Sequence, residues 1–109
     1  MLCHEFGIMV QAPCPRERFD RYDPERYGCI RVSDDDLQPV LEAFRLGRSY
    51  WHTLQRSELG LAYSGVTLIP PETCGKYLEI VLSQPRLASL ASLLLQATQK
   101  QQFVIHFGI

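Results

Sequence analysis

The chain has 109 residues, of which 46% are hydrophobic and 21% charged, a composition typical of one globular domain that can bury a core. Eleven basic and twelve acidic residues leave a net charge of −1, so we expect neither nucleic acid nor an anionic membrane surface as a partner. No apolar run approaches the roughly 20 residues that span a bilayer. The first residues also lack the basic and apolar regions of an export signal. We therefore predict a single non-membrane domain over residues 1–109.

The four cysteines show neither a CxxC pair nor a regular disulfide framework. Without an export signal, this pattern is typical of reduced thiols in the cytoplasm. We therefore predict a cytoplasmic protein whose cysteines are all free thiols, namely Cys3, Cys14, Cys29 and Cys74.

The first predicted element is a strand over residues 2–10, where side chains alternate with the two-residue period of a strand. His4 falls on the more apolar side of that strand. A histidine at the edge of the core with one hydrogen-bonded ring nitrogen is the simpler interpretation, and a functional role is the alternative.

Residues 11–27 form a long irregular stretch that is rich in proline and in charges of both signs. Its aromatic residues argue against disorder, so we predict a packed surface loop that includes a turn of helix. Arginines beside aromatic rings could hold a phosphate or a nucleobase, although the neighbouring carboxylates favour arginines paired within the loop. The ligand-binding candidates are Arg16, Arg18, Arg21, Tyr22 and Tyr27, together with Trp51 further along the chain.

A short strand is predicted over residues 28–32, followed by the polar run Ser33–Asp36. Serine and aspartate cap helix N-termini, where negative charge is also favourable. Because proline is tolerated in the first turn, Pro39 predicts a helix that begins at Asp35 or Asp36 and ends near Gly47. The aspartates could instead bind a divalent cation, but capping accounts for them without one.

Two strands are predicted next, over residues 50–54 and 61–69, and the turn-rich segment between them makes them hairpin partners. Helices follow over residues 71–83 and 85–100, and each opens with a proline that suits a first turn. Apolar residues recur at helical spacing in both. In the second helix the predicted core stripe is Leu87, Leu90, Ala91, Leu94, Ala97 and Thr98, widened by Leu93 and Leu95.

The last predicted strand covers residues 102–108. We assign Phe103, Ile105 and Phe107 to the side that faces the helices, which leaves Val104 and His106 on the other side. The two helices before it form a crossover long enough to permit a parallel pair with the strand over residues 61–69.

These elements predict an α/β fold of the two-layer kind, with a mixed sheet of about five strands and three helices mainly on one face. Three helices can cover one face of such a sheet but hardly both. We therefore predict that the second face forms a homodimer interface, with coverage by the loop over residues 11–27 as the competing possibility.

The sequence contains no complete catalytic or nucleotide-binding motif. Three histidines on predicted strands, His4, His52 and His106, could instead share a metal site or supply a general base beside a cysteine. Alternation argues against this, because it places His4 and His106 on opposite faces. On this hypothesis the catalytic candidates are His52, His106, Cys29 and Tyr63, and the metal candidates are the three histidines.

Three short segments of the chain resemble small bacterial proteins that have no assigned function. The resemblance implies a bacterial origin, but it implies no activity and identifies no catalytic residue. The segments are Tyr50–Leu54, Gly60–Glu72 and Val104–Gly108.

A protein without a motif is most simply interpreted as a non-enzymatic module of the bacterial cytoplasm that binds another protein or a small ligand and needs no cofactor. The alternative is a small hydrolase-like or metal-dependent enzyme that uses His4, His52 and His106 with a cysteine.

Overall fold

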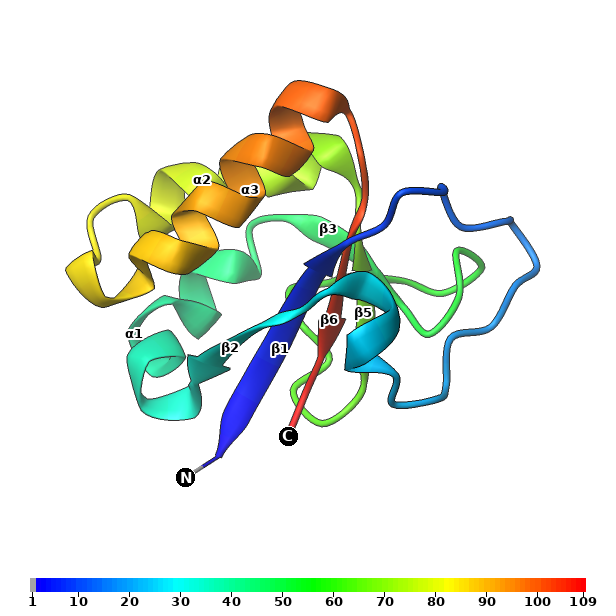
Figure 1. The fold of residues 1–109 in the computed structure, drawn as a ribbon, viewed down its shortest axis with the longest axis horizontal. Helices are drawn as coiled ribbons and strands as arrows, with labels where there is room; N and C mark the ends of the chain where they lie inside the picture. Colours follow the sequence, from blue (N-terminus) through cyan, green and yellow to red (C-terminus); the bar gives the residue numbers. More distant parts are fainter. Residues whose placement is uncertain (1) are drawn as a thin grey trace.

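The computed structural model describes residues 2–109, which form an α/β fold with three α-helices and one six-stranded sheet (Figure 1). The predicted class is confirmed, but the sheet has six strands rather than about five. In chain order the elements are β1 (Cys3–Ile8), the 3-10 helix η1 (Pro24–Tyr27), β2 (Ile30–Ser33), α1 (Asp34–Phe44), β3 (Arg48–Trp51), β4 (Ser57–Leu59), β5 (Val66–Ile69), α2 (Pro71–Val81), the 3-10 helix η2 (Pro85–Leu87), α3 (Ala88–Lys100) and β6 (Val104–Phe107). Across residues 2–109, no helix has the length and apolar character to cross a bilayer.

The strands lie in the order β2-β1-β6-β5-β3-β4, and every neighbouring pair is antiparallel. The prediction of a mixed sheet with a parallel pair is therefore wrong. The reason is the helical hairpin between β5 and β6, in which α2 and α3 lie side by side (Figure 1). The chain runs away along α2 and returns along α3, so it re-enters the sheet at the end where β5 finished and β6 runs antiparallel to β5.

Helix α1 begins at Asp34, one residue before the earliest predicted start. The Oγ of Ser33 accepts a hydrogen bond from the Asp35 N–H at 3.2 Å, which confirms that the polar run caps the helix. Pro39 consequently lies beyond the first turn, contrary to the prediction. The helix tolerates it because Pro39 and Asp35 are both exposed, so the carbonyl of Asp35 that loses its partner can bond to water.

All three α-helices lie on one side of the sheet (Figure 1) and share its main hydrophobic core. The predicted stripe of α3 is confirmed at Leu90, Leu94 and Ala97, which are fully buried. The stripe is narrower than predicted, since the Leu95 side chain is 45% exposed. The buried aromatic residues between α1 and α2 are Phe44 and Tyr77, whose stacked rings have centroids 4.0 Å apart.

The opposite face of the sheet is covered by the segment that joins β1 to β2, which Figure 1 shows on the far side of the sheet from the helices. Here a second hydrophobic cluster forms from Met9, Phe19, Val66, Leu68, Ile105 and Phe107. The sides assigned to the last strand are therefore wrong, because Val104 packs with the helices while Ile105 and Phe107 pack under the loop. Alternation separates the two sides of a strand but does not say which side meets the helices.

Candidate functional site

The loop between β1 and β2, residues 9–29, is fastened to the sheet at both ends and near its middle. Met9 donates its N–H to the Phe103 carbonyl at 2.9 Å, and Phe19 donates its N–H to the His52 carbonyl at 2.7 Å. The Phe19 ring is buried in the second hydrophobic cluster. The loop also contains the short helix η1, as predicted. These anchors hold the loop as an arch over the sheet.

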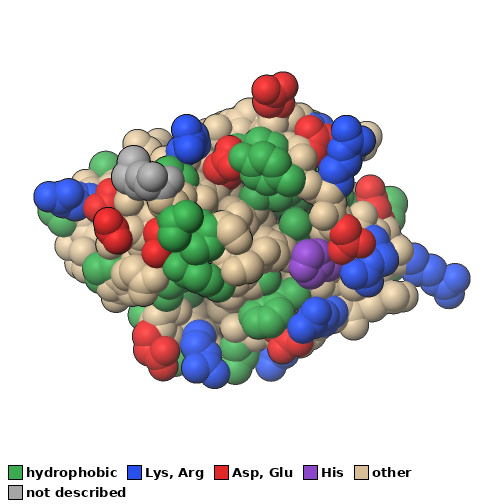
Figure 2. Space-filling view, turned by 90° about the horizontal axis from the view of Figure 1, so that it is seen from below, with side chains coloured by type: hydrophobic (Ala, Val, Ile, Leu, Met, Phe, Trp, Pro, Cys, Tyr) green, Lys and Arg blue, Asp and Glu red, His purple; other side chains and the backbone are tan. Residues whose placement is uncertain are grey.

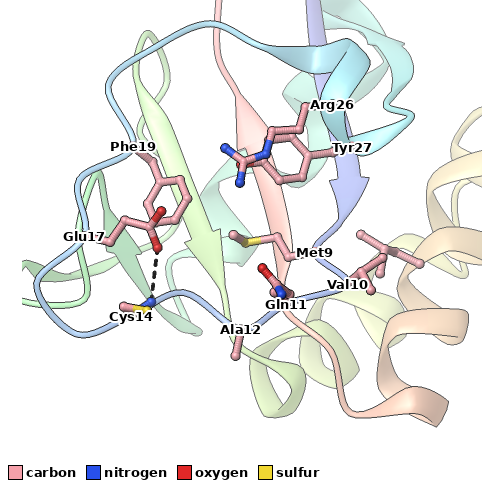
Figure 3. Close-up of a pocket in the computed structure, with 10 residues that line it drawn as sticks. Met9, Val10, Gln11, Ala12, Cys14, Glu17, Phe19, Arg26 and Tyr27 are labelled. Atoms are coloured by element: carbon pink, nitrogen blue, oxygen red, sulfur yellow. Dashed lines mark hydrogen bonds between the residues drawn. The ribbon is translucent and has the colours of Figure 1, made fainter.

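A hollow of about 520 Å³ lies under one side of this arch, and we call it the loop pocket. It is bordered by residues 8–12 and by Cys14, Glu17, Phe19, Arg26 and Tyr27. Figure 3 shows Met9 at its centre, with Phe19 on one side and Tyr27 on the other. The lining is therefore largely apolar, as in sites that bury the body of a small ligand.

Two charged side chains of opposite sign stand at the rim of the loop pocket. Arg26 stacks on Tyr27, with its guanidinium carbon 5.2 Å from the ring centroid. Glu17 lies on the Phe19 side, where its Oε1 accepts a hydrogen bond from the Cys14 N–H at 3.3 Å (Figure 3). Within the described part of the chain, neither charged group forms an ion pair. Both are therefore free to bind charged groups of a ligand.

A smaller hollow of about 300 Å³ adjoins the loop pocket and shares four of its lining residues, Glu17, Phe19, Arg26 and Tyr27. Its floor is the sheet itself, at Ile105 and Phe107. Phe19 and Tyr27 therefore border both hollows.

Of the predicted ligand-binding arginines, Arg18 and Arg21 line this second hollow, and Arg16 lines neither hollow. The expected pairing within the loop is present for Arg18, whose Nε donates to Asp20 at 2.9 Å. That hydrogen bond raises the pKa of Arg18 and lowers the pKa of Asp20. Charges of both signs are likewise interspersed over the molecular face in Figure 2, with no large block of one sign.

The three aromatic ligand-binding candidates, Tyr27, Tyr22 and Trp51, lie in different places. Tyr27 is a wall of the loop pocket. Tyr22 instead donates its hydroxyl to Glu5 of β1, a hydrogen bond that raises the pKa of Tyr22. Trp51 lies away from the loop, where its indole N–H donates to the Gly60 carbonyl at 3.0 Å.

His52 links the loop to the end of β3. Its backbone has a φ of 66°, a left-handed conformation that ends the strand at Trp51. Its Nδ1 lies 2.9 Å from Asp20 Oδ1 and 3.2 Å from the Phe19 carbonyl. The charge of His52 contributes to the lowered pKa of Asp20, after the larger effect of Arg18. His52 therefore holds the loop to the end of β3, and it forms no hydrogen bond with His4 or His106.

A chain of hydrogen bonds inside the core joins His4 and His106, and we call it the buried relay. His4 Nε2 lies 2.8 Å from Asp34 Oδ1, and His4 Nδ1 lies 2.9 Å from His106 Nε2. His106 Nδ1 lies 3.1 Å from Thr67 Oγ1, which accepts the Ala62 N–H at 2.8 Å. The prediction that His4 and His106 lie on opposite faces is therefore wrong. It rested on the inverted assignment of the last strand.

One arrangement of protons satisfies every atom of the buried relay when both imidazoles are neutral. The Asp34 carboxylate can only accept, so His4 donates from Nε2 and accepts at Nδ1. His106 must then donate from Nε2, which leaves its Nδ1 to accept the Thr67 hydroxyl proton. Burial is the main cause that lowers the pKa of His106 well below its usual value, and a positive charge on His4 would lower it further. The hydrogen bond from His4 lowers the pKa of Asp34.

The buried relay offers no room for a substrate at its imidazoles, since His4 and His106 are 0% exposed. Only the outer end of the relay reaches solvent, since the Asp34 side chain is 13% exposed. The Tyr63 ring lies beside His4, with the two ring centroids 5.3 Å apart. Across residues 2–109, no group of three or more histidine, cysteine or acidic side chains is arranged to hold a metal ion. The relay therefore ties β1, β5 and β6 to the start of α1.

Of the cysteine and tyrosine candidates, Cys29 packs against the second hydrophobic cluster, whereas Tyr63 lies beside the buried relay. Burial, then the charges of Glu5 and Asp23, raises the pKa of Cys29 to about 12, so little of the nucleophilic thiolate exists at neutral pH. Tyr63 lies at the Asp34 end of the relay, where its hydroxyl accepts a hydrogen bond from Gln38 at 3.3 Å, and the nearby Asp34 carboxylate raises the pKa of Tyr63. All four cysteines are unpaired in the described structure.

Comparison of the chain with protein-family models, curated proteins and solved structures gives no match. Sequence reasoning did not select Met9, Glu17, Phe19 or Arg26, although apolar residues inside a charged loop were a signal that the loop covers something. Neither did it select Asp34 and Thr67, whose roles depend on pairings across the sheet.

Proposed function

We propose that this protein is a small-ligand-binding module of the cytoplasm and that the loop pocket is its site. The observation that carries the proposal is the combination of an apolar hollow of about 520 Å³ with two unpaired, oppositely charged side chains at its rim. Ligand pockets combine an apolar body with a few polar groups that fix orientation, and Met9, Phe19 and Tyr27 supply that body here.

The geometry gives less support to a hydrolase that uses the histidines with a cysteine. The imidazoles of His4 and His106 are enclosed in the core, and His52 lies with the loop. The raised pKa of Cys29 also makes this thiol a poor nucleophile near neutral pH.

The proposal can be tested by amide NMR with a set of small aromatic and aliphatic carboxylates, amines and amino acids. We expect at least one compound to shift resonances of residues 8–19 and 26–27, with little change elsewhere. Cys14 is exposed at the rim, so attaching a bulky maleimide there should abolish the shifts.

The matched control is Cys14→Ser treated with the same reagent, which should keep the binding. Mass spectrometry before and after treatment identifies the modified thiol. A screen in which no compound perturbs these residues, or in which the Cys14 adduct binds as well as the unmodified protein, would refute the proposal.

A further inference from the structure

The rim of the loop pocket carries one positive and one negative group, which restricts the chemistry of a ligand. Arg26 extends from the Tyr27 side toward Phe19, and Glu17 lies near Phe19 and Cys14 (Figure 3). Both side chains face the same hollow without forming an ion pair with each other in residues 2–109. An anionic ligand would leave Glu17 without a partner, and a cationic ligand would leave Arg26 without one.

We propose that the loop pocket binds a zwitterion of the α-amino acid type with an apolar or aromatic side chain. This inference rests on the proposed function and names the ligand class of the same site. The ligand carboxylate pairs with the Arg26 guanidinium, whose planar fork matches a carboxylate. The ligand ammonium pairs with Glu17, which still has one carboxylate oxygen that does not accept the Cys14 N–H.

The apolar side chain of such a ligand has a matching surface between Phe19 and Tyr27, above Met9. Aromatic rings on both sides favour an aromatic ligand, and the thioether of Met9 adapts to its shape. Arg26 is already held against the Tyr27 ring, so binding orders this side chain less than it would a free arginine.

The loop pocket is large enough for an amino acid. The charges of Arg26 and Glu17 at its rim predict an order of affinities. Both charged groups are exposed at the rim, so each ligand contact should contribute modestly, about five- to tenfold in affinity. A ligand that keeps both charges should therefore bind better than either analogue that keeps only one.

The test is isothermal titration of the protein with three compounds that share one ring, L-phenylalanine, 3-phenylpropionate and 2-phenylethylamine. L-phenylalanine should bind most tightly. Arg26→Gln should weaken L-phenylalanine and 3-phenylpropionate about five- to tenfold and leave 2-phenylethylamine unchanged. Glu17→Gln should weaken L-phenylalanine and 2-phenylethylamine and leave 3-phenylpropionate unchanged.

Arg16→Gln is the matched control, since Arg16 belongs to the same loop but does not line the hollow. It should leave all three affinities unchanged. Arg26→Lys keeps the charge, so it should restore part of the loss even if Arg26→Gln disturbs the packing on Tyr27. Circular dichroism establishes that each variant is folded.

Either single-charge analogue binding as tightly as L-phenylalanine would overturn the zwitterion inference while leaving a ligand site in place. Failure of all three compounds to bind would overturn it as well. The proposed function would then depend on the wider amide NMR screen, in which another chemical class could still perturb the loop pocket.

Discussion

Thr67 ends the buried relay at the side opposite Asp34. Its hydroxyl oxygen accepts the Ala62 N–H, so its proton is free to be donated to His106 Nδ1. Removing this hydroxyl leaves both a buried N–H and a ring nitrogen without a partner, and unpaired buried groups are costly.

We therefore expect Thr67→Val to lower the free energy of unfolding by about 1–3 kcal/mol, as measured by urea denaturation. Thr98→Val is the control, because the Thr98 hydroxyl bonds only to a helix carbonyl, that of Leu94. That change should cost less than about 0.5 kcal/mol. Equal losses in the two variants would mean that the Thr67 hydroxyl has no special role.

The buried relay also predicts a dependence of stability on pH. His106 has a pKa in the folded state that lies well below its usual value of 6.5, so the unfolded chain binds this proton more readily. The stability that a neutral His106 provides is complete above pH 6.5 and is lost as the pH falls toward the folded-state pKa. The lowered pKa of Asp34 adds a further loss as the pH falls below 3.8.

The measurement is the free energy of unfolding of the wild type and of His106→Gln between pH 7.5 and pH 5. For the wild type we expect an additional loss of up to about 1.4 kcal/mol per pH unit, since one proton is involved. Comparing the two proteins removes the contributions of groups that do not contact His106, such as His52, so the difference belongs to His106 and the His4 ring bonded to it. Parallel pH profiles would show that His106 takes up its proton equally in both states.

Helix α3 contributes Leu90, Leu94 and Ala97 to the main hydrophobic core. Two adjacent leucines of this helix allow a direct comparison. Leu94 is 1% exposed and Leu95 is 45% exposed. Leu94→Ala should lower the free energy of unfolding by roughly 2–5 kcal/mol, because it leaves a cavity. Leu95→Ala should cost below about 1 kcal/mol. Chemical denaturation of both variants measures the two losses. Similar losses would contradict the assignment of Leu94 to the core and Leu95 to the surface.

Helices and strands were predictable from the sequence because their signals are local. Proline at the start of α2 and helical spacing along α3 led to the correct bounds within two or three residues. The strand predicted from Leu61 begins only at Val66, since residues 60–65 contain a turn that strand-forming residues conceal. Strand β4 was missed because three residues carry too little periodicity.

The candidate sites were only partly predictable, because they depend on pairings between distant segments. His106 lies opposite Phe6 in β1 and opposite Thr67 in β5. Neither register can be predicted from the residues next to His106 in the sequence. The loop was recognised as a packed segment with binding potential. Which of its residues would face the hollow depended on where Phe19 anchors the loop on the sheet.

At the scale of the whole molecule, the loop covers the sheet face that the sequence left open for a second copy. Phe19 and Met9 pack on Ile105 and Phe107, so the apolar surface of this face is already covered within one chain. We therefore expect light scattering over a micromolar dilution series to give the monomer mass of 12.5 kDa. A dimer whose interface maps to the loop by hydrogen exchange would restore the homodimer predicted from the sequence.

The central claim is that the hollow beneath the loop admits a small ligand, and Met9 reports on it most directly. The chain has only two methionines, so a sample with ¹³C-labelled methionine methyl groups gives a simple spectrum, in which Met9→Leu assigns the pocket signal. Titration with L-phenylalanine should shift the Met9 methyl resonance and produce nuclear Overhauser contacts between that methyl group and the ligand ring. A Met9 resonance that stays unmoved at saturating ligand would contradict the account.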